Sequence, residues 1–287
     1  MTLSSDLGRL GGLARRTQLR RLGHSDDDIR RFVAAGHARP LRRSWLVGPT
    51  ANPLACRAVE LGGVLGGESA LRSWGIWVSH DGGLCVVAPP TASRLPAVDT
   101  GEYRLHPRAF SWPTGWRTDV VTALAVHVPR IEPFHAIASI DSALHQNLLL
   151  PEQLPVLFAL LPRRCRRLRR LIDSRCESGI ESLLRVAAIF EGWHVEVHVS
   201  IRGVGRVDLV INRWLVIEAD GDAWHSSREQ RLRDRARDAA IVKLGMRSHR
   251  FGHPQILNDL PGCVEVIRAY LVAGPPRGPF ENRASGR

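Results

Sequence analysis

The clearest pattern in the sequence is a change of hydrophobic period between residues 178 and 220. Residues 178–193, SGIESLLRVAAIFEGW, place apolar side chains at helical spacing and predict an amphipathic helix. Residues 194–201, 206–211 and 214–220 are rich in β-branched residues and predict three strands. A helix followed by strands indicates a mixed sheet flanked by helices in this part of the chain.

Helix signals also lie on both sides of these strands. Ser178 and Glu181 have the spacing of a capping box, so one role expected for Glu181 is to cap its own helix. RLRDRARDAAIVKLG (231–245) predicts a helix that ends at Gly245, and RSHRFGHP (247–254) predicts a last core strand. The expected packing residues of the helix 231–245 are Leu232, Ala236, Ala239 and Leu244.

The N-terminal part predicts a smaller domain of three short helices and a β-wing. Ser25 and Asp28 have capping-box spacing, Gly36 stands where a C-cap belongs, and HARPLRRSWLVGP (37–49) reads as the basic wing. In the middle of the chain, TDVVTALAVHVP (118–129) predicts a short strand. The expected segments are a winged-helix-like domain (1–49), a mixed α+β middle domain with a basic helix (50–171), an α/β domain (172–272) and a disordered tail (273–287).

Charge narrows the class of partner. The net charge of +12 and a pI of about 11.0 favour a polyanion, either nucleic acid or an acidic membrane surface. Six arginines fall within residues 163–170, a run that suits either a solvated helix face or a nucleic-acid backbone. The expected phosphate contacts are Arg30, Arg31, Arg39, Arg42, Arg43, Arg163, Arg164, Arg166, Arg167, Arg169 and Arg170.

Other features favour a cytoplasmic, soluble protein without a membrane partner. The start MTLSSDLGRLGG lacks the basic and apolar regions of a signal peptide, and no apolar stretch approaches membrane-spanning length. The five cysteines are scattered and form no CxxC pair, which argues against a zinc site or a disulfide framework.

The stretch GRVDLVINRWLVIEADGDAWH (205–225) places acids in an otherwise apolar hairpin. If the loop is the three residues 212–214, Asp208 lies opposite Glu218, and Asp220 shares their face of the sheet. A two-residue loop would shift the register and separate Asp208 from Glu218. Facing carboxylates repel one another, and Mg²⁺ or Mn²⁺ would compensate their charge. Such a metal can activate water at a phosphodiester.

These acids belong to a longer ordered pattern. Along the chain it reads Glu181, Asp208, Glu218-Ala219-Asp220-Gly221, His225, Asp234 and Arg237. The pattern resembles the PD-(D/E)XK nuclease superfamily, and more closely its domains of unknown function related to very-short-patch-repair (Vsr-like) endonucleases. The resemblance covers about residues 172–272 and implies a restriction-endonuclease-like fold. The N-terminal part more weakly resembles the winged-helix domain of AbiEi-family antitoxins.

The resemblance also implies roles. Asp208 and Glu218 would bind the metal, with support from Glu181 and Asp220. Asp220 replaces the lysine of the superfamily, and as in other Vsr-like members a nearby histidine, His225, would act as the general acid/base. Alternatively, Lys243 of the following helix could take the place of the missing superfamily lysine as a catalytic lysine that has moved along the sequence. Asp234 and Arg237 would face the cleft, and Arg237 would lie near the scissile phosphate.

The leading hypothesis is therefore a Mg²⁺- or Mn²⁺-dependent endonuclease that acts on DNA, in repair, phage defence or a toxin–antitoxin system. An alternative is a DNA-binding regulator or antitoxin whose nuclease-like domain is inactive. An RNA-directed nuclease would share the same chemistry, so RNA stays open as a substrate. Cleavage of both strands by one site per chain would require a homodimer.

Overall fold

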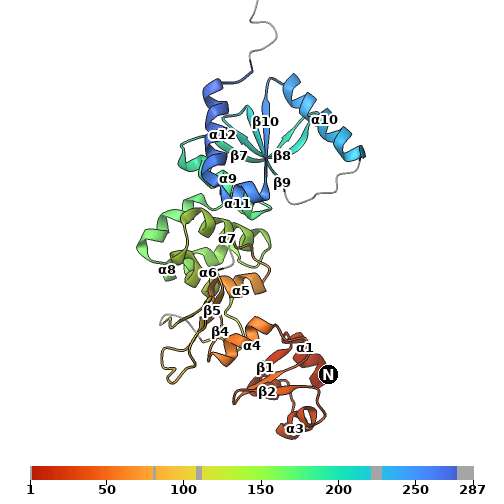
Figure 1. Cartoon of the computed structure of the whole chain (residues 1–287), viewed down its shortest axis with the longest axis vertical. Coiled ribbons are helices and arrows are strands. Elements are labelled where there is room, and N and C mark those ends of the chain that lie inside the picture. Colours follow the sequence, from red (N-terminus) through yellow and green to blue (C-terminus); the bar gives the residue numbers. More distant parts are fainter. Residues whose placement is uncertain (1, 80–81, 108–111, 221–227, 277–287) are drawn as a thin grey trace, which may run out of the picture. The chain divides into compact units, whose positions relative to one another are not determined.

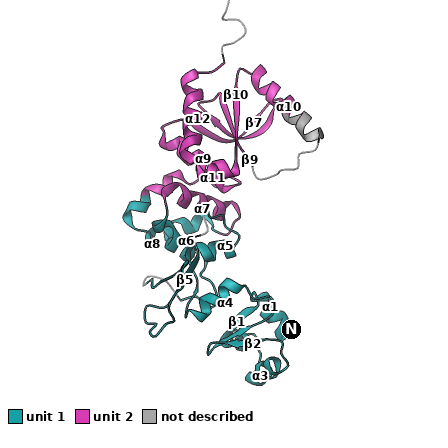
Figure 2. Ribbon diagram, viewed as in Figure 1, with its two compact units in different colours: residues 1–131, 149–166 teal, residues 132–148, 167–287 magenta. Residues whose placement is uncertain are grey.

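The computed structural model describes residues 2–79, 82–107, 112–220 and 228–276, with residues 228–234 described in their backbone only. Over these residues the chain is a mixed α+β protein with three sheets flanked by helices, which confirms the expected fold class at this level. It divides into two compact units, residues 1–131 with 149–166 and residues 132–148 with 167–287 (Figure 2). Within the described ranges, no helix combines the length and apolar character of a membrane span.

The first unit begins with three helices and a three-stranded antiparallel sheet of order β1-β3-β2. Ser25 caps α3 through its hydroxyl, which accepts a hydrogen bond from the Asp28 N–H at 3.1 Å, and the Asp28 carboxylate accepts from the Ser25 N–H at 3.0 Å. The predicted capping box is thus confirmed. These elements are α1 (Leu3–Arg9), β1 (Leu13–Arg15), α2 (Arg16–Arg21), α3 (Asp26–Ala34), β2 (Arg39–Leu41) and β3 (Trp45–Val47).

The rest of the first unit surrounds a second three-stranded sheet, of order β4-β5-β6. The predicted strand 118–129 is wrong, because these residues form helix α6 and the turn η1. Asp119 begins α6 by accepting a hydrogen bond from the Thr122 N–H at 2.9 Å, a capping signal that outweighs the β-branched content. The elements are α4 (Pro53–Glu60), β4 (Val64–Leu65), α5 (Gly67–Ser73), β5 (Leu84–Val87), β6 (Glu102–Leu105), α6 (Val120–His127), η1 (Val128–Arg130), η2 (Pro151–Gln153) and α8 (Leu154–Leu160).

The second unit holds a four-stranded mixed sheet of order β10-β9-β8-β7, with α12 and α10 on opposite sides of it (Figure 1). Strand β10 is parallel to β9, and the other pairs are antiparallel. Helix α7 packs against α9 in this unit, so the predicted middle segment contributes to both units. The elements are α7 (Pro133–His145), α9 (Gly179–Phe190), β7 (Val195–Ile201), β8 (Gly205–Ile211), β9 (Leu215–Asp220), α10 (Arg228–Lys243), β10 (Arg247–Gly252), α11 (His253–Asn258) and α12 (Leu260–Ala273). The short helix η3 (Arg163–Leu171) precedes α9 and contains the unit boundary.

The register of the β8–β9 hairpin is the predicted one. Leu209 pairs with Ile217 and Ile211 with Leu215, so the loop is residues 212–214 and Asp208 lies opposite Glu218. Asn212 and Arg213 in the loop have φ values of 48° and 67°, in the left-handed region that tight turns use.

Helix α10 packs differently from the prediction. Ala236, Ala239 and Leu244 are exposed, whereas Ile241 is 1% exposed and packs against Val210 and Val216 of the sheet. Val210 and Val216 lie on the same face of the sheet as Asp208. Because Ile241 covers these two valines, the acids line only the other end of that face. The side chain of Leu232 lies outside the described residues.

Candidate functional site

One row of charged side chains crosses the four strands of the second unit. Val197 pairs with Leu209 and Val199 with Val207, which sets His198 of β7 opposite Asp208 of β8. The hairpin sets Asp208 opposite Glu218 of β9, and Glu218 pairs with Arg250 of β10. Residues directly opposite in neighbouring strands have Cβ atoms about 5 Å apart. The sheet register therefore brings an imidazole, two carboxylates and a guanidinium together.

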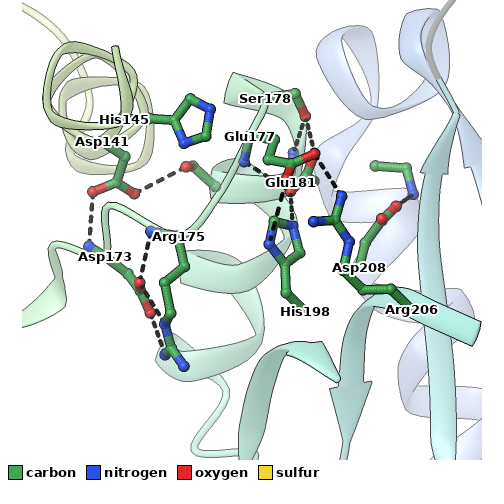
Figure 3. Close-up of polar contacts among 12 residues, drawn as sticks. Asp141, His145, Asp173, Arg175, Glu177, Ser178, Glu181, His198, Arg206 and Asp208 are labelled. Carbon is green, nitrogen blue, oxygen red and sulfur yellow. Dashed lines mark hydrogen bonds and ion pairs between the residues drawn. The ribbon is translucent and has the colours of Figure 1, made fainter. Parts of the chain in front are cut away.

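Helix α9 adds Glu181 to one end of this row (Figure 3). Glu181 is 6% exposed, and Ser178 caps the helix by accepting from the Glu181 N–H at 3.3 Å. The Glu181 carboxylate accepts hydrogen bonds from the Ser178 hydroxyl at 2.7 Å and from the Glu177 N–H at 3.1 Å. Its Oε2 also lies 2.9 Å from Nε2 of His198. Ser178 is thus the cap of the helix, and the Glu181 carboxylate binds Ser178 and the Glu177 N–H while it contributes to the site.

His198 is the residue that the sequence analysis missed. Its φ of 52° is left-handed, although it lies inside a strand whose register continues unchanged on both sides. Nδ1 of His198 lies 4.0 Å from Glu177, whose carboxylate accepts from Arg206 at 2.8 Å. The hydrogen bond from Arg206 holds the pKa of Glu177 below its usual range. Register arithmetic applied to the β7–β8 hairpin could have found His198, since that hairpin also has a three-residue loop, 202–204.

Asp208 is the central acid of the row. Its Oδ2 accepts a hydrogen bond from the Ala219 N–H at 2.9 Å. Burial raises the pKa of Asp208 above its usual value, and the neighbouring carboxylates of Glu181 and Glu218 raise it further against the effect of that hydrogen bond. One ligand atom each from Glu181, His198 and Asp208 lie within 4.8 Å of one another. We call these three residues the Glu-His-Asp cluster; they could hold a metal ion.

Glu218 has different partners from the expected ones. It is 7% exposed, and its two carboxylate oxygens form ion pairs with Arg237 of α10 and Arg250 of β10, each at 2.6 Å. Each oxygen of the Glu218 carboxylate thus accepts from a guanidinium group in this structure. Of the expected metal ligands, the structure brings Asp208 and Glu181 together with His198, and Glu218 lies beside them with its two arginines.

The other expected site residues lie at the edge of the row or outside the described residues. The carboxylate of Asp220 is largely exposed and lies 3.4 Å from Nε of Arg250. Arg237 donates to the carbonyl of Arg206 as well as to Glu218. Lys243 at the end of α10 is exposed. Two predicted residues cannot be placed, because His225 and the side chain of Asp234 lie outside the described residues.

The arginines expected to contact phosphate fall into two groups. Those of η3 are all exposed, while Cys165 and Leu168 on the same segment are buried. In the N-terminal part, Arg30 and Arg31 form ion pairs with Asp27 and Asp28 of their own helix. Arg42 donates to the carbonyl of Glu60 at 2.9 Å, and Arg39 and Arg43 are exposed. The η3 group is Arg163, Arg164, Arg166, Arg167, Arg169 and Arg170, of which Arg164 donates to the carbonyl of Pro129 at 2.9 Å.

Comparison with known proteins gives no family assignment. No protein-family model matches the chain, and no curated protein matches it.

Proposed function

We propose that this protein is a metal-dependent endonuclease that hydrolyses phosphodiester bonds in DNA. One observation carries the proposal: the Glu-His-Asp cluster lies directly beside two arginines that share Glu218. Carboxylates and an imidazole are ligands for a divalent cation, and guanidinium groups are donors for phosphate oxygens. A phosphodiester hydrolase needs both chemistries within one site.

The donor set fits a cation. Burial and two neighbouring carboxylates raise the pKa of Asp208, so its ionised form lacks compensating charge that a cation would supply. A bound divalent metal would activate water and stabilise negative charge on a phosphate oxygen. Arg237 and Arg250 would orient the scissile phosphate, and Glu218 would hold both guanidiniums in place. As the resemblance implies, His225 would protonate the leaving oxygen, and Asp220 would either add a metal ligand or orient His225.

The order of elements supports a nuclease fold. The second unit runs helix α9, strands β7, β8 and β9, helix α10 and strand β10, with Glu181, Asp208 and Glu218 on the helix and strands that the PD-(D/E)XK resemblance requires. The three helices and antiparallel sheet of the N-terminal part are consistent with a winged helix that contacts DNA. The exposed η3 arginines would hold the phosphate backbone and make binding depend on salt.

A DNA-binding regulator with an inactive nuclease-like domain is the second candidate. The observation that favours it is the full occupation of Glu218 by Arg237 and Arg250, which removes one acid from the expected metal site. A domain that only binds DNA would retain the arginines and would not need the Glu-His-Asp cluster.

Cleavage of supercoiled plasmid and of labelled DNA and RNA oligonucleotides, in Mg²⁺, Mn²⁺ or EDTA, tests the proposal. We expect metal-dependent DNA cleavage by the wild type, lost in Asp208→Asn and Glu181→Gln by on the order of 100-fold or more. Asp238→Asn, which removes an exposed acid of α10, is the matched control and should cleave like the wild type. DNA binding without cleavage in any metal would favour the regulator. Cleavage of RNA alone would show that RNA, and not DNA, is the substrate.

A further inference from the structure

We propose that the Glu-His-Asp cluster selects a divalent transition metal of the Mn²⁺ to Zn²⁺ series over Mg²⁺, with Nε2 of His198 as a direct ligand. The metal binding rests on the geometry of these three residues. Only its use in cleavage rests on the proposed function. The inference replaces Glu218 of the expected ligand set with a residue from a different strand.

The three side chains are close to a binding arrangement. A divalent ion with bonds of about 2.1 Å holds its ligand atoms about 3–4 Å apart. One ligand atom of each residue already lies within 4.8 Å of the other two, and Nε2 of His198 is 2.9 Å from Oε2 of Glu181. Small side-chain rotations would therefore complete the site, and the contact between His198 and Glu181 would give way to bonds to the shared ion.

The backbone of β7 is locally distorted at His198. A strand residue ordinarily has a negative φ, but His198 has a φ of 52°, while Val197 and Val199 on either side keep their pairs with β8. Such conformations persist only where the surrounding structure holds them, and they gather at functional sites. Here the distortion accompanies a ring whose Nε2 lies 2.9 Å from Oε2 of Glu181.

The surroundings of His198 also suit a ligand. A histidine that binds metal through one nitrogen usually directs the N–H of the other toward a carboxylate. Nδ1 of His198 lies 4.0 Å from the carboxylate of Glu177, and Arg206 fixes that carboxylate at 2.8 Å (Figure 3). Glu177 and Arg206 would become positioning residues for the imidazole if Nδ1 of His198 closes this 4.0 Å separation to a hydrogen bond when the metal binds.

The donor set decides which cation is preferred. Mg²⁺ takes oxygen ligands in an octahedron and keeps several waters, whereas imidazole is a favourable ligand for Mn²⁺, Co²⁺ and Zn²⁺. A site with two carboxylates and one imidazole consequently binds the transition metals more tightly than Mg²⁺. Loss of the imidazole should remove that preference and leave a weak oxygen site.

Calorimetric titration of the metal-free full-length protein with Mn²⁺, Co²⁺ and Mg²⁺ tests the preference. We expect Mn²⁺ and Co²⁺ to bind at least about tenfold more tightly than Mg²⁺, and His198→Asn to lower their affinity by on the order of 10- to 100-fold. Asparagine is chosen because it tolerates a positive φ. The matched control is His194→Asn, which changes an exposed histidine next to the same strand and should bind like the wild type.

Pulsed electron paramagnetic resonance of the Mn²⁺ complex gives an independent measure. Protein labelled with ¹⁵N-histidine should show nitrogen coupling to Mn²⁺, and His198→Asn should lose it while thermal unfolding in EDTA verifies that the variant is folded. Equal affinities for Mn²⁺ and Mg²⁺, or coupling that survives in His198→Asn, would overturn the inference. Metal binding with the expected coupling but without DNA cleavage overturns the proposed function alone, and cleavage without nitrogen coupling overturns this inference alone.

Discussion

Two acids of the second unit, the buried Asp141 and the half-buried Asp208, differ in how their charge is compensated. Asp141 of α7 accepts hydrogen bonds from the Asp173 N–H at 2.8 Å, the Ser182 hydroxyl at 2.9 Å and Arg185 at 2.8 Å. Among the described residues, Asp208 has one such donor, the Ala219 N–H, and its neighbours are two acids and the imidazole of His198. The first arrangement joins α7 to α9 and the segment before it, whereas the second leaves charge for a further partner.

Burial acts in the same direction at both sites. It raises the pKa of Asp141 to about 6, against the opposing charge of Arg185, and it raises the pKa of Asp208 as well. Burial therefore does not distinguish a structural acid from a functional one. The two sites differ in the number and charge of the surrounding donors, which set how much free energy the ionised carboxylate costs.

Breaking the compensated pair should have the largest effect on stability. Asp141→Leu leaves Arg185, which is 3% exposed, as an unpaired buried charge, so we expect the free energy of unfolding to fall by about 3–5 kcal/mol. Urea unfolding followed by circular dichroism measures this. The double variant Asp141→Leu with Arg185→Met should recover most of the loss; if the double variant is no better than the single one, the pair does not act through its charge.

Removing the carboxylate that Arg237 and Arg250 share should have the second largest effect on stability. Glu218→Gln takes one charge from between Arg237 and Arg250, and we expect about 1–3 kcal/mol lower stability because both guanidiniums are partly buried. Calorimetric Mn²⁺ titration should give an affinity within about twofold of the wild type, since Glu218 is not a ligand in this arrangement. A large loss of metal affinity would instead restore Glu218 to the metal site that the sequence predicts.

Relieving the uncompensated acid should change stability in the opposite direction. Asp208→Asn removes a carboxylate from between Glu181 and Glu218, and we expect the metal-free protein to gain about 0.2–1 kcal/mol from the loss of like-charge repulsion. Thermal unfolding in EDTA measures this gain, and added Mn²⁺ should then stabilise the wild type but not the variant. A destabilised metal-free variant would show that Asp208 is a structural acid like Asp141.

The smallest effect concerns the two groups of arginines. Arg167→Gln removes an exposed charge of η3, and we expect DNA affinity to fall severalfold. The slope of the logarithm of the binding constant against the logarithm of the salt concentration should become less steep by about 1. Arg31→Gln removes a guanidinium already paired with Asp28 and should change both quantities less. Fluorescence anisotropy over a range of salt concentrations compares them, and equal effects would remove the distinction between the groups.

The sequence by itself determined the features that depend on neighbours along the chain. The capping residues Ser25 and Ser178 could be predicted because an N-cap side chain accepts from the backbone N–H three residues later in the sequence. The two-residue period of a strand sets Asp208 opposite Glu218 once the loop has three residues, and the structure decided between that loop and a two-residue one. These rules use hydrogen bonds and distances that a few consecutive residues define.

Only the tertiary structure decided which distant segments meet these features. The β-branched stretch 118–129 folds as a capped helix in a buried setting, and α7 packs with the second unit rather than with its sequence neighbours. Glu218 receives Arg250 across the sheet and Arg237 from α10, while Asp208 receives Glu181 and His198. Whether an acid meets an arginine, an imidazole or another carboxylate depends on those long-range contacts, because Coulomb interactions act through space and not along the sequence.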